Sequence, residues 1–89
     1  MKEIKTIKIL DNYKLLIQFD NEEKRIYDMS NRLNGVFAHL KDYEKFKLVK
    51  IVDGIPTWPS NEALPTGFYI DICPDAIYLN SLPTLDDYE

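Results

Sequence analysis

Two short apolar segments near the start of the chain constrain the fold more than any other feature. Residues 4–10 (IKTIKIL) and 13–19 (YKLLIQF) are rich in β-branched and aromatic side chains, which favour β-strands. Asp11 and Asn12 separate them, and both residue types tolerate the positive φ angle of a tight turn. The two segments therefore predict an antiparallel β-hairpin.

The alternation of side chains along a strand sets the register of this hairpin. A strict two-residue turn would put Ile7 and Ile9 on the face opposite that of Leu15 and Ile17. A three-residue loop that includes Tyr13 keeps the apolar face continuous. It pairs Ile9 with Leu15 and Ile7 with Ile17, and we therefore predict the three-residue loop.

A third strand is predicted at residues 24–29 (KRIYDM), after a polar turn. Ile26 and Tyr27 are both large, and neighbouring side chains of a strand point to opposite faces. The sequence therefore does not decide which of the two faces the core.

The middle of the chain shows helical spacing that is interrupted once. Apolar residues recur at i, i+3, i+4 and i+7, and Ser30 is expected as the N-cap. The apolar positions are Leu33, Val36, Phe37 and Leu40. Gly35 interrupts this pattern, so two short helical pieces are expected rather than one helix. Asp42 is expected to cap the second piece, DYEKF.

An Asp-Gly pair at residues 53 and 54 is the strongest hairpin signal in the chain, because it favours a two-residue turn. It joins a predicted strand at 47–52 (KLVKIV) to a return strand at 55–59 (IPTWP). This turn pairs Val52 with Ile55 and Val49 with Trp58.

The return strand is predicted to lie at a sheet edge, because Pro56 and Pro59 cannot donate hydrogen bonds to a ladder. An edge offers backbone groups or an apolar rim to another protein. We therefore expect a partner contact at Pro56, Trp58 and Pro59, assisted by Asp86 and Asp87 of the acidic tail. The alternative is a protected edge with Trp58 buried in the core.

The last third of the chain predicts a loop, a short strand, a helical turn and a tail. Pro65 and Gly67 punctuate residues 60–67, which predicts a loop. Residues 68–72 (FYIDI) follow as a short strand. The acidic segment 80–89 is expected to be frayed.

The only cysteine is expected to be structural. Pro74 is favoured at the first helical position, which places Cys73 at the cap of a helical turn with Ile77 or Tyr78 packing inward. A helix N-terminus lowers the pKa of a thiol, whereas the carboxylates that flank Cys73 in sequence raise it. We therefore expect a small buried residue rather than a reactive thiol.

His39 is the only histidine, which excludes metal sites built from several histidines. Cys73 and His39 are left as the one nucleophile–base pair that the sequence offers, and a small enzyme using them stays open as an alternative. His39 itself is expected on the solvent side of its helix. No catalytic residue, metal ligand or cofactor site is predicted.

Charge bears on the class of partner. The chain has 89 residues, which is enough for one domain with a small core, and its net charge is -4. A negative charge opposes binding to a phosphate backbone, and Lys2, Lys5 and Lys8 are spaced so that they do not share one face of a strand. A basic protein is therefore the expected partner, with a nucleic-acid-associated regulator as a further alternative.

The start of the chain bears on location. No apolar stretch approaches the ~20 residues that cross a bilayer, and lysines interrupt the N-terminal segment where a secretory signal is apolar. A lone cysteine agrees with a reducing compartment. We expect a cytoplasmic protein that binds no membrane, and formation of a homo-oligomer stays open.

The order of several loose motifs resembles a known family. These motifs are YKLLIQFDN, RIYDMS, GVFAHLKDYEKF, TWP and CPDAIY. Their succession over residues 4–79 resembles the small bacterial family called domain of unknown function 2442. Glu22 replaces the family's turn glycine, and the segment between Trp58 and Pro74 is longer than in the family.

The resemblance implies a compact α+β domain with a small antiparallel sheet and short helices. It transfers no catalytic residue, and members look like companions of small toxin–antitoxin-type operons. Residues and resemblance together predict one α+β domain over 1–89, with about four to six short strands and about two or three short helices. The expected function is a non-enzymatic protein-interaction module, an accessory or antitoxin-like partner in such an operon.

Overall fold

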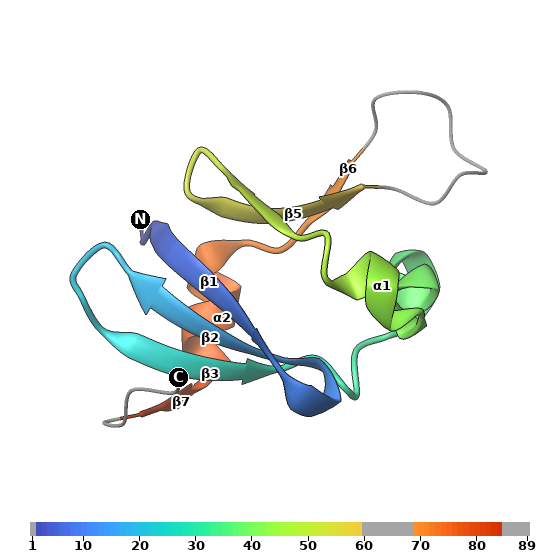
Figure 1. Cartoon of the computed structure of the whole chain (residues 1–89). Coiled ribbons are helices and arrows are strands. Elements are labelled where there is room, and N and C mark those ends of the chain that lie inside the picture. The colour runs from blue at the N-terminus through green and yellow to red at the C-terminus, as the bar shows by residue number, and fades with distance from the viewer. Residues whose placement is uncertain (1, 60–68, 85–89) are drawn as a thin grey trace.

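Two antiparallel β-sheets and several short helical segments make up the structure (Figure 1). The computed structural model describes residues 2–59 and 69–84. In chain order the elements are β1 (Ile4–Leu10), η1 (Asp11–Tyr13), β2 (Lys14–Phe19), β3 (Lys24–Asp28), η2 (Gly35–Lys41), α1 (Tyr43–Phe46), β4 (Lys50–Val52), β5 (Ile55–Pro59), β6 (Tyr69–Asp71), α2 (Pro74–Leu79) and β7 (Leu82–Pro83). The strand orders are β1-β2-β3-β7 and β4-β5-β6, which confirms the α+β class. The seven strands of the described residues exceed the number predicted.

The first hairpin has the predicted register. The three-residue segment η1 joins β1 to β2, and its Asn12 and Tyr13 both have a φ angle of 61°. Asn12 tolerates this left-handed conformation better than most residues. The paired residues are Ile9 with Leu15 and Ile7 with Ile17, as predicted.

The register also decides which face of β3 is buried. Tyr27 pairs with Leu15 of β2, and both side chains are buried. Ile26 pairs with Leu16 on the other face and is only partly buried. Tyr27 therefore faces the core, whereas Ile26 faces outward.

Two short helical pieces follow, as predicted, although the first is a 3₁₀-helix. It starts at Gly35, whose φ angle is 57°. The N-cap predicted at Ser30 is wrong, because the backbone N–H of Ser30 donates to the Asp28 carboxylate in a separate turn. Asp42 caps α1 as predicted by accepting a hydrogen bond of 3.1 Å from the backbone N–H of Glu44.

The second hairpin has the predicted two-residue turn. Its Asp and Gly have φ angles of 53° and 79°, and Val52 pairs with Ile55. The strand β4 begins only at Lys50. The ladder therefore has the predicted register but ends at Lys50 and Thr57, one pair before Val49 and Trp58.

The predicted edge position of β5 is also wrong, because β5 lies between β4 and β6. The pair that closes a two-residue turn is hydrogen-bonded, and alternate residues of a strand direct their backbone groups to opposite sides. The nitrogen of Pro56 accordingly faces β6, at the point where the β5–β6 ladder ends. The Pro56 carbonyl faces the same side and accepts a hydrogen bond from the backbone N–H of Ile72. The nitrogen of Pro59 faces the side of β4, beyond its first residue. Each proline thus occupies a position where its missing N–H breaks no ladder bond.

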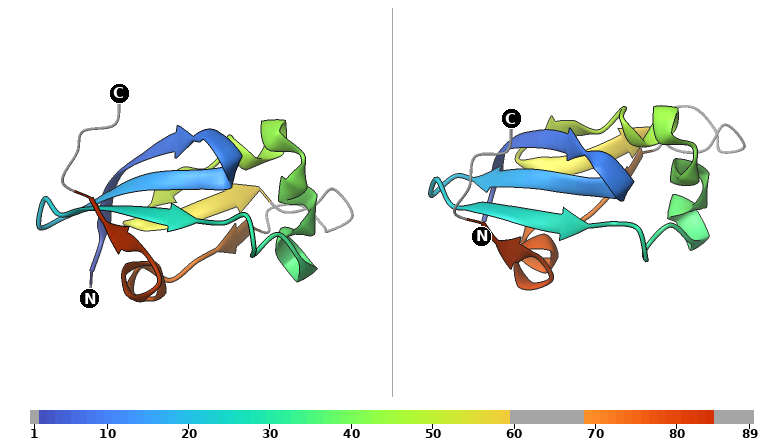
Figure 2. Two further views of the ribbon diagram at one scale, coloured as in Figure 1. Left: turned by 90° about the horizontal axis from the view of Figure 1, so that it is seen from below. Right: turned by 60° about the horizontal axis from the view of Figure 1, so that its bottom comes forward.

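The core lies between the two sheets and is closed at one end by η2 and α1 (Figure 2). Trp58 is 0% exposed, and its indole N–H donates to the Phe46 carbonyl at 2.9 Å. Its ring packs against the rings of Phe37 and Phe46. Ile77 of α2 is fully buried, which confirms its predicted inward direction.

Residues 80–84 are ordered into the fold, contrary to the prediction of a frayed tail. β7 pairs with β3 at the end of the four-stranded sheet. The backbone N–H of Thr84 donates to the Lys24 carbonyl at 3.2 Å. The sheet therefore includes a strand from near the end of the chain.

A polar network fixes α2 and β7 to β3. The Arg25 guanidinium donates to the hydroxyl and the carbonyl of Ser81 at 2.7 and 2.6 Å, and to the Glu23 carboxylate at 2.8 Å. The Tyr78 hydroxyl donates to the same carboxylate at 2.6 Å. We call Glu23, Arg25, Tyr78 and Ser81 the C-terminal latch.

The predicted strand at 68–72 is confirmed over the residues of β6. The predicted loop at 60–67 and the tail residues Asp86 and Asp87 lie outside the described residues. In the described parts, 2–59 and 69–84, no helix has the length and apolar character needed to span a bilayer.

Candidate functional site

An apolar surface lies on and just before β4. Leu48 is 51% exposed, Ile51 37% and Val52 49%. β4 is the outermost strand of its sheet, so side chains on both of its faces reach solvent. We call Leu48, Ile51 and Val52 the β4 surface.

A hollow of about 410 Å³ adjoins the β4 surface on the outer face of the three-stranded sheet. Val52, Ile55 and Pro59 supply its apolar wall, and Thr57 lies between them. Thr57 is only 8% exposed, and its hydroxyl donates to the Ile55 carbonyl at 3.0 Å. We call this cavity the sheet hollow.

The rim of the sheet hollow carries three charged side chains, which come from two strands and from the hairpin turn. Lys50 and Asp71 pair with Thr57 from its two neighbouring strands, so they lie on opposite sides of the cavity. Asp53 of the hairpin turn completes the lining. Within residues 2–59 and 69–84, the side chains of these three residues form no ion pair.

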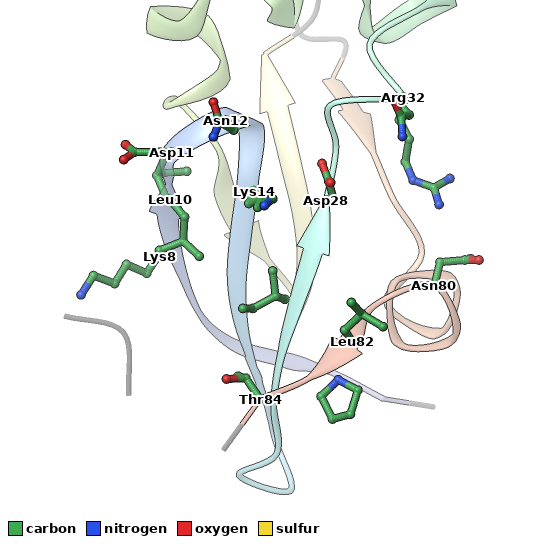
Figure 3. Close-up of a pocket in the computed structure, with 14 residues that line it drawn as sticks. Lys8, Leu10, Asp11, Asn12, Lys14, Asp28, Arg32, Asn80, Leu82 and Thr84 are labelled. Carbon is green, nitrogen blue, oxygen red and sulfur yellow. The ribbon is translucent and has the colours of Figure 1, made fainter. Parts of the chain in front are cut away.

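The larger groove on the outer face of the four-stranded sheet differs in its electrostatics (Figure 3). It has a volume of about 900 Å³ and extends from Lys8 of β1 to Leu82 of β7. Hydrogen bonds from the Ser30 hydroxyl and backbone N–H, with Lys14 and Arg32 nearby, hold the pKa of Asp28 below its usual value. The lining contains three cationic side chains and two carboxylates, so opposite charges lie close together in this groove; they belong to Lys8, Lys14, Arg32, Asp11 and Asp28.

The structure corrects the predicted environment of Cys73. It is the N-cap of α2, as predicted, but it is exposed rather than buried. It lies on a third hollow, of about 450 Å³, together with Tyr27 and Arg32. Exposure alone does not make the thiol a nucleophile, because no base contacts it among the described residues.

His39 is partly buried rather than on the solvent side, and its Nε2 lies 3.1 Å from the Pro59 carbonyl oxygen. No hydrogen bond joins His39 to Cys73 in the described part of the chain. Those residues also contain no group of three or more His, Cys, Asp or Glu side chains arranged to hold a metal ion. The geometry therefore does not assemble the Cys–His pair that the sequence left open.

The predicted partner-contact residues differ in their exposure to solvent. Pro56 and Trp58 are buried and face the core, so neither offers a surface to a partner. Pro59 is partly buried and lines the sheet hollow. Sequence reasoning missed the β4 surface, because the KLVKIV segment predicted a strand and carried no signal of which side chains would stay exposed.

Two of the N-terminal lysines, Lys2 and Lys5, form contacts within the molecule. Lys5 Nζ lies 2.7 Å from the Glu22 carboxylate, and Lys2 Nζ lies 4.2 Å from the centre of the Tyr78 ring. These contacts partly satisfy the two positive charges.

Comparison with known proteins gave no match to a family model, to a curated protein or to a solved structure. The resemblance to domain of unknown function 2442 therefore stays a prediction.

Proposed function

We propose that the protein is a non-enzymatic protein-interaction module that binds its partner through the β4 surface and the adjoining sheet hollow. One observation carries this proposal. Of the five large apolar side chains that are exposed among residues 2–59 and 69–84, three belong to the β4 surface. Exposed apolar groups along an edge strand, beside charged ones, are typical of protein contacts.

The energetic reason is the cost of leaving apolar area in water. Fully burying a Leu, Ile or Val side chain contributes roughly 1.5–3 kcal/mol, so completing the burial of a half-exposed one contributes roughly half as much. Three such side chains together contribute roughly 2–4 kcal/mol, which is part of what an interface of modest size needs. The remaining exposed apolar residues, Leu79 and Leu82, lie on the side of α2 and β7.

The proposal includes a basic partner, because the chain carries a net charge of -4 and opposite charges speed and orient association. The resemblance adds a context: an accessory or antitoxin-like role beside a toxin in a small operon. That context rests on association of the motifs, whereas the contact surface rests on side-chain exposure.

The test is affinity capture from the native host with the wild-type chain and two variants. The first variant replaces two residues of the β4 surface, Ile51→Glu and Val52→Glu. The control is Leu79→Glu, which places one such charge on another exposed apolar residue. Thermal unfolding of all three proteins confirms that each is folded at the capture temperature.

We expect the wild type and the Leu79→Glu control to capture the same protein in equal amounts. The β4 variant should capture at least tenfold less of that protein. Equal retention by all three would contradict the proposed surface. Loss with Leu79→Glu alone would move the contact to α2 and β7, and would equally overturn the proposal.

A further inference from the structure

The sheet hollow combines an apolar wall with an excess of negative charge at its rim. Its wall consists of Val52, Ile55 and Pro59, and its charged groups are one ammonium, Lys50, and two carboxylates, Asp53 and Asp71. A purely apolar ligand side chain would leave both carboxylates without a partner. An acidic side chain would meet two like charges and one opposite charge.

Arginine and lysine side chains match both features of this cavity. Each has an aliphatic stem that packs on apolar groups and a cationic head that stays in contact with water or carboxylates. The stem would cover Val52 and Ile55, which are otherwise in contact with solvent. The head would reach the rim, where charge-assisted hydrogen bonds to carboxylates are stronger than neutral ones.

We propose that the sheet hollow binds an arginine or lysine side chain of the partner protein, with its cation at Asp71. This inference rests on the proposed function, since it assigns the residue type that the same surface recognises. It makes Asp71 a specificity-determining residue. It also explains how an acidic chain selects a basic partner at one defined place rather than by net charge alone.

The probe is a phage-displayed library of random linear peptides, selected on the immobilised wild-type chain. Peptides that are enriched are synthesised, and their dissociation constants are measured by fluorescence anisotropy. The variants are Asp71→Asn, Asp71→Lys and the β4 double substitution at Ile51 and Val52. The matched control is Asp20→Asn, which removes an exposed carboxylate in the turn between β2 and β3.

We expect enrichment of Arg or Lys next to apolar residues. A partly exposed ion pair contributes up to about 1 kcal/mol, so Asp71→Asn should weaken binding about fivefold. Asp71→Lys should weaken it further and shift the selection toward acidic peptides, and Asp20→Asn should have no effect. Because Asp71 is exposed, its substitutions leave the core intact, and circular dichroism verifies this.

Two outcomes separate this inference from the proposed function. Peptides that lose binding with the β4 double substitution, but are not basic and do not respond to Asp71, would overturn the basic-residue inference and leave the β4 surface standing. Peptides that respond to neither set of variants would overturn both. Selection of acidic peptides by the wild type would show that Lys50, rather than Asp71, determines which residue the cavity binds. That outcome would also refute the inference.

Discussion

At the scale of single residues, burial decides what a conspicuous side chain does. Trp58 is the one tryptophan and lies in a proline-flanked segment, which made it a candidate for the centre of a partner contact. Its indole is instead enclosed by aromatic rings and hydrogen-bonded to the Phe46 carbonyl. Its size therefore serves packing between the sheet of β5 and the helical segments.

Replacing Trp58 with Ala should lower the free energy of unfolding by roughly 3–5 kcal/mol, because it leaves a large cavity and removes a buried hydrogen bond. Urea denaturation followed by circular dichroism measures this change. Leu79→Ala is the matched control, since an exposed leucine is expected to contribute within about 0.5 kcal/mol. A fall below about 1 kcal/mol for Trp58→Ala would contradict the core assignment.

Residue identity alone was a poor guide to exposure. Cys73 is accessible although free cysteines are usually buried, and Ile51 and Val52 are accessible although their types favour the core. Exposure depends on which elements cover a residue, and those elements come from distant parts of the chain. The β4 surface could not be predicted from the local sequence for this reason.

At the scale of elements, local turn chemistry was the most reliable signal. Both hairpins and the cap at Asp42 were predictable, because each depends on residues a few positions apart. The position of β5 was not, because it depends on pairing with β6 across a long connection. The strand β7 was missed for the same reason: two residues give no periodic pattern, and β3 alone makes them a strand.

Gly54 offers a test of the second hairpin. Its φ angle is +79°, and a Cβ atom there would lie 2.8 Å from the Glu3 Cβ atom. Gly54→Ala should therefore combine a left-handed backbone cost of roughly 1–2 kcal/mol with a steric clash. The measurement is the free energy of unfolding in urea.

Gly35→Ala is the matched control for this substitution. Gly35 has a φ angle of +57°, and nothing lies within 4 Å of the position its Cβ would take. Only the backbone cost applies there, so Gly54→Ala should be the more destabilising of the two. Equal effects would show that the chain at Glu3, just before β1, moves aside without a measurable cost in stability.

At the scale of the whole molecule, the C-terminal latch joins β3 and the turn before it to α2 and the residue before β7. Hydrogen bonds from Tyr78 and Arg25 hold the pKa of Glu23 below its usual value of 4.5. The hydrogen bond to Glu23, with some burial, raises the pKa of Tyr78 above its usual value of 10.0. The latch is thus intact with a charged carboxylate and a protonated phenol.

The signs of these shifts predict how stability depends on pH. A carboxylate with a lowered folded pKa stabilises the fold above about pH 4.5, and this contribution is lost as the pH falls through the folded value. A phenol with a raised folded pKa stabilises the fold below about pH 10, and this contribution is lost as the pH rises through the folded value. The latch therefore contributes most between these limits.

Thermal unfolding as a function of pH measures this contribution. Glu23→Gln should lower the melting temperature at neutral pH and should reduce its fall on acidification. Tyr78→Phe should reduce the fall at alkaline pH. Asp28 also has a lowered pKa, so Asp28→Asn is the comparison that separates the latch from other carboxylates. Identical acid profiles for Glu23→Gln and the wild type would contradict the assigned role.

The pairing of β7 with β3 also has a consequence for synthesis on the ribosome. The Arg25–Ser81 bonds join residues separated by 56 positions, so the first hairpin emerges long before the residues that close its sheet. Until α2 and β7 have left the exit tunnel, Phe19 lacks the Tyr78 ring that packs against it in the finished fold. The first hairpin is therefore accessible to chaperones and proteases until these later residues emerge.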